Sequence, residues 1–453
     1  MPRVVIAGTH SGCGKTTTAM GIAAALTARG VTVQAYKTGP DYIDPAFYGE
    51  LTGRPGRNLD GWMLSENTLR YLFERNAAGA DVALIEGVMG LYDGIGSQGS
   101  ASTAEAAMLL ESPVILVIDV QGMATSAAAL VLGYQQYNPS LKLAGVIVNR
   151  FSHARHLNTI RSAVEQSTGI SVLGGLPRSS DFSLGSRHLG LVPAAELANL
   201  PSRIQTLRAA VEEHLDLELL LRLAATAPVF QQPADPAAGL APVHAVRIGV
   251  AKDRAFHFYY QDSLDLLERL GAQLVPFSPL ADPGLPADVN GLLIGGGFPE
   301  VFARELSENH RMKAAIAQAL DNGMPCLAEC GGLMLLAGQL CDASGETYPM
   351  TGFLPASVRM TDQLQRFGYV TVTQTRDTVI GPRGTVFRAH EFHYSAADVS
   401  GIPTAYSVSR ASDGRTWECG FIKENTLAAY PHLNFWSNPS LAVHFLNACQ
   451  AWR

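Results

Sequence analysis

One short segment near the start of the chain constrains its fold more than any other feature. The apolar run Val4–Ala7 leads into Gly8–Thr17 (GTHSGCGKTT), and a helical pattern follows from Ala19 to Arg29. A strand, a glycine-rich turn and a helix in this order predict a phosphate-binding loop, because the N–H groups of the turn and the lysine converge on an anion. The strict pattern has glycine at Thr9, whereas here the glycine comes one residue earlier, at Gly8.

This loop predicts a bound nucleoside triphosphate with Mg²⁺, since its lysine reaches the outer phosphates and its threonine is a metal ligand. Asn149 ends a predicted strand where a base-reading residue belongs, but the following Arg150-Phe151-Ser152 lacks the aspartate that would read guanine. ATP is therefore favoured over GTP. The residues predicted to contact the nucleotide are Thr9, Gly12, Gly14, Lys15, Thr16, Thr17 and Asn149.

Apolar, β-branched runs alternate with helical patterns in both halves of the chain. Such runs predict buried strands of mostly parallel sheets with helices on both faces. Between the halves, residues 225–245 are rich in alanine and proline, which predicts a linker. We therefore expect two α/β domains, over residues 1–224 and 246–453. The predicted strands are Val4–Ala7, Val31–Tyr36, Val82–Ile85, Val114–Ile118, Ala144–Val148, Val246–Ala251, Gln273–Phe277, Gly291–Ile294 and Pro325–Leu327.

Three acidic residues follow predicted strands of the first domain. Asp41 and Asp44 come after the second strand, and Glu86 comes directly after the third. For each acid alone, capping of a turn is the commoner role. Because ligands of an open parallel sheet bind beyond the carboxyl ends of the strands, three acids there favour a metal and substrate site. We predict Thr16, Asp41 and Glu86 as Mg²⁺ ligands and Asp44 as a substrate contact.

A second reactive group lies in the other half of the chain. Cys330 stands between a predicted strand and a helical pattern, in Pro325–Leu333 (PCLAECGGL), which is typical of a nucleophile elbow. A helix N-terminus behind the thiol would lower its pKa. A thiol nucleophile also needs a base and an oxyanion hole. We predict His432 as the base, and Gly296, Gly297 and Gly331 as the oxyanion and glutamine site.

Several neighbouring residues are given other roles. Cys326 lies inside the strand and is interpreted as a buried structural cysteine. His444 lies on an apolar helical pattern and is interpreted as a packing residue. The polar segment His390–Ser395 (HEFHYS) is assigned either a structural or a domain-interface role.

Composition excludes several other classes of protein. The 453 residues carry a formal net charge of −7 and no long basic run, which argues against a nucleic-acid partner. The most apolar region, residues 104–134, is interrupted by charged residues and proline, so no membrane span is expected. The six cysteines form no CxxC pair, and the N-terminus has no signal-peptide pattern. We expect a cytoplasmic protein with reduced thiols.

The motifs occur in one order across both domains, and the whole chain resembles the cobyrinic acid a,c-diamide synthase family. The first domain is similar to dethiobiotin synthetase, a P-loop NTPase fold with a mostly parallel sheet. The second is similar to the class I glutamine amidotransferases of the triad type. The resemblance is carried by Gly8–Thr17, Tyr36–Phe47, Glu86–Gly94, Arg187–Pro193, Gly295–Glu300, Ala328–Leu333 and His390–Ser395.

This resemblance implies a reaction and its participants. Cys330 would release ammonia from L-glutamine through a thioester, with His432 as proton shuttle. ATP with Mg²⁺ would convert the a and c acetates of cobyrinic or hydrogenobyrinic acid to acyl phosphates, which ammonia would displace. Homodimer formation is left open. The substrate contacts implied are Tyr42, Asp44, Arg54, Arg187 and His188, with Arg57 and Arg178 as further cationic anchors; solvated surface charge is the alternative for each cation.

The chain departs from related patterns at two positions. Triad amidotransferases carry His-x-Glu, whereas this chain has His432-x-Asn434, so the group that orients the base is undefined by sequence. Partition-type ATPases carry lysine where this chain has His10, which counts against a dimer-switch ATPase. The rival functions are a nickel-sirohydrochlorin a,c-diamide synthase and a regulatory P-loop ATPase with a non-catalytic amidotransferase-like module. Cobyric acid synthase is disfavoured because its loop pattern differs.

Overall fold

The computed structural model describes residues 1–96, 99–179, 182, 186–187, 190–191, 199–243 and 245–452. The chain divides into two compact units, Met1–Asp235 and Pro236–Arg453. The division falls inside the segment 225–245. Residues at the start of this segment are fastened to the first unit: Arg3 donates to the Pro228 carbonyl (2.7 Å) and its guanidinium lies 4.7 Å from the centre of the buried Phe230 ring.

The first unit is built on a fully parallel sheet, as the sequence predicts. Within the described residues the sheet has seven strands in the order β3-β2-β4-β1-β5-β6-β7. The five predicted strands of this half are present, and β3 and β7 are additional. The bounds are β1 Arg3–Gly8, β2 Val33–Thr38, β3 Arg57–Leu59, β4 Val82–Glu86, β5 Val114–Asp119, β6 Leu143–Phe151 and β7 Ser171–Pro177; a separate pair is formed by β8 Ser186–Arg187 and β9 Gly190–Leu191.

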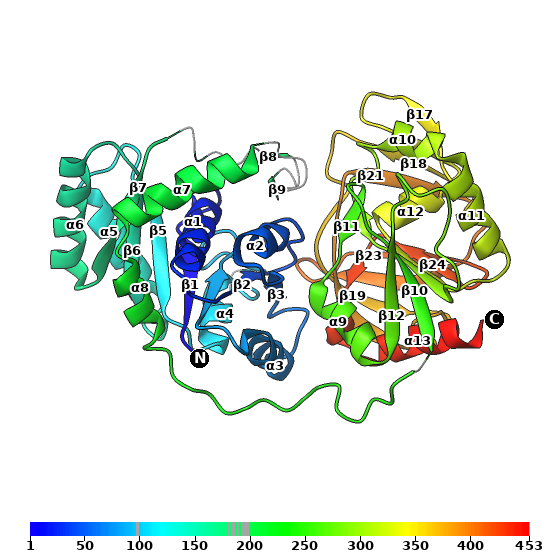
Figure 1. Ribbon diagram of the computed structural model, residues 1–453, viewed down its shortest axis with the longest axis horizontal. Helices are drawn as coiled ribbons and strands as arrows, with labels where there is room; N and C mark the ends of the chain where they lie inside the picture. The colour runs from blue at the N-terminus through cyan, green and yellow to red at the C-terminus, as the bar shows by residue number, and fades with distance from the viewer. Residues whose placement is uncertain are drawn as a thin grey trace. The chain divides into compact units, whose positions relative to one another are not determined.

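Helices cover the sheet because parallel neighbours require crossover connections. Helix α1 is buried almost all round, since it packs against the sheet and against α2 and α7 (Figure 1). The helical segment after residue 199 consists of two helices, because Leu215 is extended and the Asp216 side chain caps α8. The bounds are α1 Lys15–Ala28, α2 Asp44–Thr52, α3 Glu66–Ala77, α4 Thr103–Leu109, α5 Ser126–Tyr137, α6 Ala154–Thr168, α7 Leu200–His214 and α8 Leu217–Ala224.

The second unit has a mixed sheet of ten strands among its described residues, in the order β12-β10-β13-β15-β24-β23-β22-β19-β20-β25. The strands from β12 to β24 are parallel and include the four predicted ones, whereas those from β24 to β25 pair antiparallel. The bounds are β10 Val246–Ala251, β12 Ala272–Phe277, β13 Gly291–Ile294, β15 Cys326–Glu329, β19 Arg366–Gln374, β20 Val386–His393, β22 Thr404–Arg410, β23 Thr416–Lys423, β24 Thr426–Ala429 and β25 His432–Leu433.

Smaller elements complete this unit (Figure 1). Two short strands, β11 and β14, pair beside the parallel half of the sheet, and four others form a separate small sheet. The bounds are β11 Phe256–Phe258, β14 Gly296–Gly297, β16 Gln339–Cys341, β17 Thr347–Pro349, β18 Ala356–Met360 and β21 Ser395–Val399, with α9 Gln261–Arg269, α10 Ala303–Glu308, α11 His310–Asp321, α12 Gly331–Leu336, the 3₁₀ turn η2 Phe435–Ser437 and α13 Ser440–Ala451.

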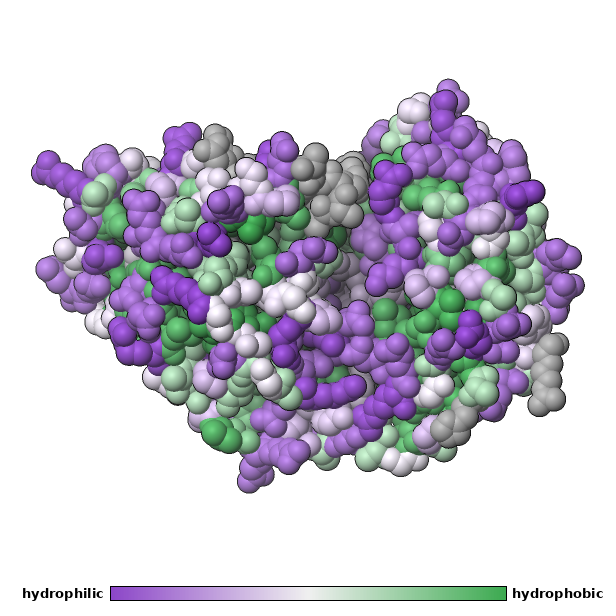
Figure 2. All heavy atoms as spheres, viewed as in Figure 1, coloured by the Kyte–Doolittle hydropathy of each residue, from purple (hydrophilic) through white to green (hydrophobic). Residues whose placement is uncertain are grey.

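In the part of the chain that the structure describes, no helix combines the length and the apolar character needed to cross a bilayer. Figure 2 shows hydrophilic residues spread over the drawn face of both units.

Candidate active sites

The phosphate loop of the first unit joins β1 to α1. Gly14, with φ +99°, precedes the first turn of α1, and the buried Lys15 donates from Nζ to the His10 carbonyl (3.1 Å). Packing explains why this loop has its first glycine at Gly8. A methyl group at Gly8 would come within 2.3 Å of the Cys13 sulfur and 2.6 Å of the Lys15 stem, so a glycine is needed where the loop folds back on its strand.

Asn149 contacts this loop rather than projecting away from it. Its side-chain amide donates to the Cys13 carbonyl (2.8 Å), and its Oδ1 accepts from the Arg150 N–H (3.0 Å). Arg150 in turn donates to the Gly12 carbonyl (3.0 Å) and pairs with Asp119 at 2.5 Å. Both ends of the Asn149 amide are thus used in holding the loop, so its position supports nucleotide binding through loop geometry.

A buried polar cluster lies beside the loop and centres on Glu86. The Glu86 side chain is fully buried and its Oε1 accepts from the Thr16 hydroxyl (2.5 Å) and from Lys37 Nζ (2.7 Å). Its other oxygen accepts from the Tyr48 hydroxyl (2.6 Å). Lys37 also pairs with Asp44 at 2.7 Å. Strands β2 and β4 bring these groups together because they are neighbours in the sheet, with Lys37 opposite Glu86.

The acids of this cluster outnumber its lysine. Burial lowers the pKa of Lys37, but Asp44 and Glu86 outweigh it and raise the pKa overall. Burial and the neighbouring Asp41 raise the pKa of Asp44 to about 8, although Lys37 opposes the shift. Asp41 uses one oxygen to cap the turn into α2, accepting from the N–H groups of Ile43 (2.8 Å) and Asp44 (2.9 Å). A cation bound at this cluster would favour the charged forms of its carboxyl groups.

The donor set fits Mg²⁺ that is shared with phosphate. Mg²⁺ is usually held by one or two carboxylates together with waters and phosphate oxygens, not by a cage of protein ligands. In agreement, no group of three or more His, Cys, Asp or Glu side chains among the described residues could hold a metal alone. Thr16 and Glu86 already meet oxygen to oxygen at the loop. Two of the three predicted Mg²⁺ ligands therefore lie together, whereas Asp41 caps the turn into α2.

The other predicted substrate contacts have different surroundings. Arg54 donates to Gln34 Oε1 (3.0 Å) and to the carbonyls of Asn76 (2.8 Å) and Ala78 (2.9 Å), so its guanidinium holds the fold of the first unit. We therefore leave Arg54 out of the substrate site proposed below. Tyr42 is half-buried next to Asp41. Arg187 is described only as part of β8, and His188 lies outside the described residues.

Cys330 lies on a strained turn at the end of β15. Its backbone has φ +48° and ψ −96°, a conformation that a non-glycine residue rarely adopts and that is typical of functional turns. Its N–H donates to the Ala429 carbonyl (2.7 Å), and its carbonyl accepts from Met334 N–H (3.1 Å) in α12. Strand, turn and helix therefore follow one another as the nucleophile-elbow pattern predicts, although the side chain is buried.

The expected low pKa of this thiol is wrong. Burial raises the pKa of Cys330, and the charges of Glu300 and Glu391 add to the effect. A hydrogen bond from Gly331 N–H acts in the opposite direction but is outweighed. Helix α12 has only six residues, so it offers little dipole to stabilise a thiolate. The thiol is protonated at neutral pH and needs a base at the moment of attack.

The glycine pair of β14 joins the nucleophile to the predicted base. A methyl group at Gly331 would come within 3.2 Å of the Gly297 nitrogen, and one at Gly296 would come within 2.5 Å of His432 Cε1. These contacts bring together all the residues predicted for the thiol site, Cys330, His432, Gly296, Gly297 and Gly331. The backbone nitrogens of Gly297 and Gly331 thereby lie at the turn that carries the thiol.

His432 is almost fully buried in β25, and burial lowers its pKa to about 3, with further lowering by His390 and His393. It is therefore neutral and can accept a proton. Its Nδ1 lies 3.9 Å from Glu329 Oε2. Sequence reasoning missed Glu329, although it stands directly before Cys330. Asn434 is occupied elsewhere, since its Oδ1 accepts from Trp436 N–H (3.0 Å) and the Ser263 hydroxyl (3.2 Å).

The segment His390–Ser395 packs against the strand that carries the base. His390 pairs in register with His432. His393 bonds Glu391 through Nε2 (2.9 Å) and the Ser395 carbonyl through Nδ1 (2.7 Å). Its ring stacks on Tyr430, with centroids 3.7 Å apart and an interplanar angle of 8°. The segment thus has a structural role beside the thiol site.

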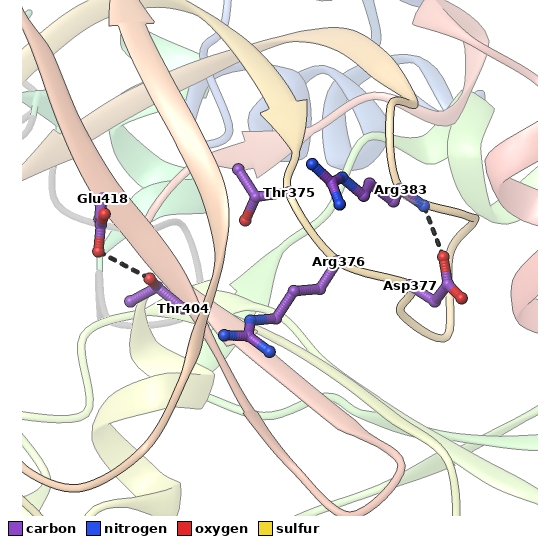
Figure 3. A pocket seen from close by; sticks show the side chains of 6 residues that line it. All are labelled: Thr375, Arg376, Asp377, Arg383, Thr404 and Glu418. Atoms are coloured by element: carbon purple, nitrogen blue, oxygen red, sulfur yellow. Dashed lines mark hydrogen bonds between the residues drawn. The ribbon is translucent and has the colours of Figure 1, made fainter.

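A hollow on the second unit lies at the other end of the sheet from this site. It measures about 550 Å³ and lies where the β19–β20 hairpin meets β22 and β23. Figure 3 shows the Thr404 hydroxyl bonded to Glu418, and the Arg383 N–H bonded to Asp377. The residues predicted for the thiol site lie at the end of β20 that carries His390 and His393. Its lining residues are Thr375, Arg376, Asp377, Arg383, Thr404 and Glu418.

Enlarging Gly296 is expected to slow glutamine hydrolysis. The added methyl group of Gly296→Ala would have to displace the His432 ring. A misplacement of about 1 Å in a catalytic group costs roughly 10- to 100-fold in turnover. Gly284→Ala is the matched control, because a methyl group there would meet nothing within 4 Å. The measurement is glutaminase kcat for both variants; equal turnover in Gly296→Ala and the native protein would contradict the placement of His432.

The fold and the two sites define a class of protein: a phosphate-loop unit followed by a unit of the glutamine amidotransferase type. Comparison with protein families agrees. The model of the CobQ/CobB/MinD/ParA nucleotide binding domain matches residues 4–192. The model of the CobB/CobQ-like glutamine amidotransferase domain matches residues 247–440.

Similar proteins of known name extend over the whole chain. A cobyrinate a,c-diamide synthase of Caldanaerobacter subterraneus is 43% identical over 448 residues, which cover 99% of this chain and 98% of that protein. Those of Listeria monocytogenes (41%, covering 99% of this chain and 100% of that protein) and Dehalococcoides mccartyi (42%, covering 100% and 99%) are similar to the same extent. The chain belongs to the cobyrinate a,c-diamide synthase family.

Proposed function

We propose that this chain uses ATP and L-glutamine to amidate the a and c acetates of cobyrinic or hydrogenobyrinic acid in cobalamin biosynthesis. The observation that carries the proposal is the presence, in one chain, of a phosphate loop beside a buried acid–lysine cluster and of a cysteine on a strained turn beside a neutral histidine. Full-length similarity to cobyrinate a,c-diamide synthases supports it.

The second unit would supply ammonia. His432 removes the proton from Cys330 as the sulfur attacks the side-chain carbonyl of glutamine. The N–H groups of Gly297 and Gly331 stabilise the oxyanion. His432 then gives the proton to the departing nitrogen, ammonia leaves, and water hydrolyses the thioester to glutamate. The Cys330 thiol and the His432 imidazole are both neutral before glutamine binds. The imidazolium therefore forms only when the sulfur attacks the substrate.

The first unit would use that ammonia. A substrate carboxylate attacks the γ-phosphorus of ATP and releases ADP, forming an acyl phosphate. Ammonia then attacks the acyl carbon, phosphate leaves, and an amide remains. Lys15 and Lys37 stabilise the charge on the transferring phosphoryl group, and Asp44 and Tyr42 are the residues proposed to orient the substrate. When bound, Mg²⁺ held by Thr16 and Glu86 would neutralise phosphate charge.

The nature of the tetrapyrrole is tested by offering three substrates in parallel. We expect a gain of two amides on cobyrinic or hydrogenobyrinic acid and none on nickel-sirohydrochlorin, measured by mass spectrometry of the products. Two amides on nickel-sirohydrochlorin alone would establish the rival synthase. No amide on any substrate, together with no glutaminase activity, would favour the regulatory ATPase and reject the proposal.

A further inference from the structure

The thiol site needs an acid that the sequence pattern does not supply. When His432 takes the thiol proton it becomes a buried imidazolium, and a buried cation requires a compensating charge. In triad amidotransferases the charge belongs to a glutamate two residues after the histidine, and Asn434 occupies that position here. This side chain carries no charge, and its oxygen is bonded to Trp436 and Ser263. The compensating group must come from another element.

We propose that Glu329, the residue immediately before the nucleophile, is the positioning acid of the thiol site. This inference rests on the proposed glutaminase function. One carboxylate oxygen of Glu329 accepts from the Leu433 N–H (3.0 Å), and the other lies 3.9 Å from His432 Nδ1. A single side chain therefore fixes the backbone of β25 and faces the ring nitrogen opposite the one that takes the thiol proton.

The sheet topology explains how this acid reaches the base. Strands β15 and β24 are parallel neighbours, with Glu329 opposite Ala429. His432 follows Ala429 by three residues, after the chain has turned into β25. The acid and the nucleophile thus leave β15 together, while the base arrives from the adjacent strand. The carboxylate thus comes from the strand of the nucleophile and faces the imidazole of the base.

The groups around His432 make Glu329 the source of negative charge. His390 and His393 face it from β20 and disfavour its protonation. The Phe258 ring lies 6.5 Å from the His432 ring, and Gly296 closes another side. Burial raises the pKa of Glu329 to about 8, while its bond from Leu433 opposes the shift. Because the pKa is raised, the carboxylate form accumulates only as the pH passes through about 8.

In this step one proton passes from Cys330 to His432 and then to the leaving nitrogen. The Cys330 proton moves to Nε2 of His432, and Nδ1–H points towards the Glu329 carboxylate. The imidazolium is stabilised until it gives the proton to the leaving nitrogen. Glu329 neither touches glutamine nor gains a proton in this step. Its effect is therefore expected on kcat and on the pH dependence, and not on KM.

The test is glutaminase activity of Glu329→Gln, which keeps the bond from Leu433 N–H and removes the charge. We expect kcat to fall roughly 10²-fold, less than the ~10⁴-fold loss seen when a hydrogen-bonded triad carboxylate is replaced, because the gap is longer than a hydrogen bond. KM for glutamine should be unchanged. In the native protein kcat/KM should rise as the pH passes about 8; in Glu329→Gln this rise should be absent.

Two further variants keep the result unambiguous. Asn434→Ser retains a capping hydroxyl for η2 and should show native kcat and a native pH profile. Glu329→Asp retains the charge and should keep the pH-dependent rise at reduced kcat, which also covers the case in which Glu329→Gln fails to fold. Native kcat and pH profile in Glu329→Gln, or the same loss in Asn434→Ser, would overturn the inference. Absence of glutaminase in the native protein would instead reject the proposed function.

Discussion

Replacing Cys330 with alanine is expected to abolish glutamine-driven amidation and to leave ammonia-driven amidation at the native rate. The variant has no sulfur to form the thioester, and no other described cysteine lies on a strained turn. Loss of a nucleophile costs at least about 10³-fold in turnover. The phosphate loop and its acid cluster lie in the other unit and are unchanged. The measurement is amide formation with saturating glutamine and, separately, with ammonium chloride.

Cys326→Ala provides the matched control for this experiment. Cys326 is fully buried inside β15, four residues before the nucleophile, and burial raises its pKa. Its removal should cost about 1 kcal/mol of stability through lost packing and leave both activities in place. Glutamine-driven amidation that survives in Cys330→Ala would remove the thioester from the mechanism. Loss of the ammonia-driven reaction would show that the change had damaged the whole chain.

Nine parallel strands were predicted, and the central ones among them are buried on both faces. A strand such as β5 is apolar up to its last residue, Asp119, and needs no pairing information to be recognised. The antiparallel strands of the second unit were not predicted. Strand β19 has a largely exposed first half, which contains Gly368, and alternates only after it. Its existence depends on partners in β20 and β22, which local sequence does not specify.

The residues of the two sites show the same contrast between local motifs, which sequence reveals, and long-range contacts, which it does not. Cys330 and Lys15 stand in local motifs, where a strand, a turn and a helix follow one another. Lys37 and Glu329 were missed because their partners are distant: Lys37 bonds Glu86, 49 positions away, and Glu329 bonds Leu433, 104 positions away. The pKa of Cys330 was misjudged for a related reason, since burial by the surrounding chain outweighs the short helix behind it.

Glu86→Gln is expected to abolish amidation from both glutamine and ammonia. The substitution keeps the shape of the side chain but removes a charge that Thr16 and Lys37 share. Loss of a preorganised electrostatic group at a phosphoryl-transfer site costs roughly 10²- to 10³-fold in kcat. It also breaks one side of a buried ion pair, which costs about 3 kcal/mol, at the low end of the range because Lys37 keeps Asp44.

Tyr48→Phe is the control variant that distinguishes loss of the Glu86 charge from loss of a hydrogen bond to Glu86. This variant removes the donor to Oε2 and keeps the carboxylate, so we expect a stability loss of about 1–2 kcal/mol and a much smaller effect on turnover. Because the two units need not unfold together, stability is best followed by hydrogen exchange at the β4 amides. Glutaminase activity of the second unit should be native in both variants. Ammonia-driven amidation at the native rate in Glu86→Gln would exclude this carboxylate from the phosphoryl-transfer site, even if β4 had become less stable.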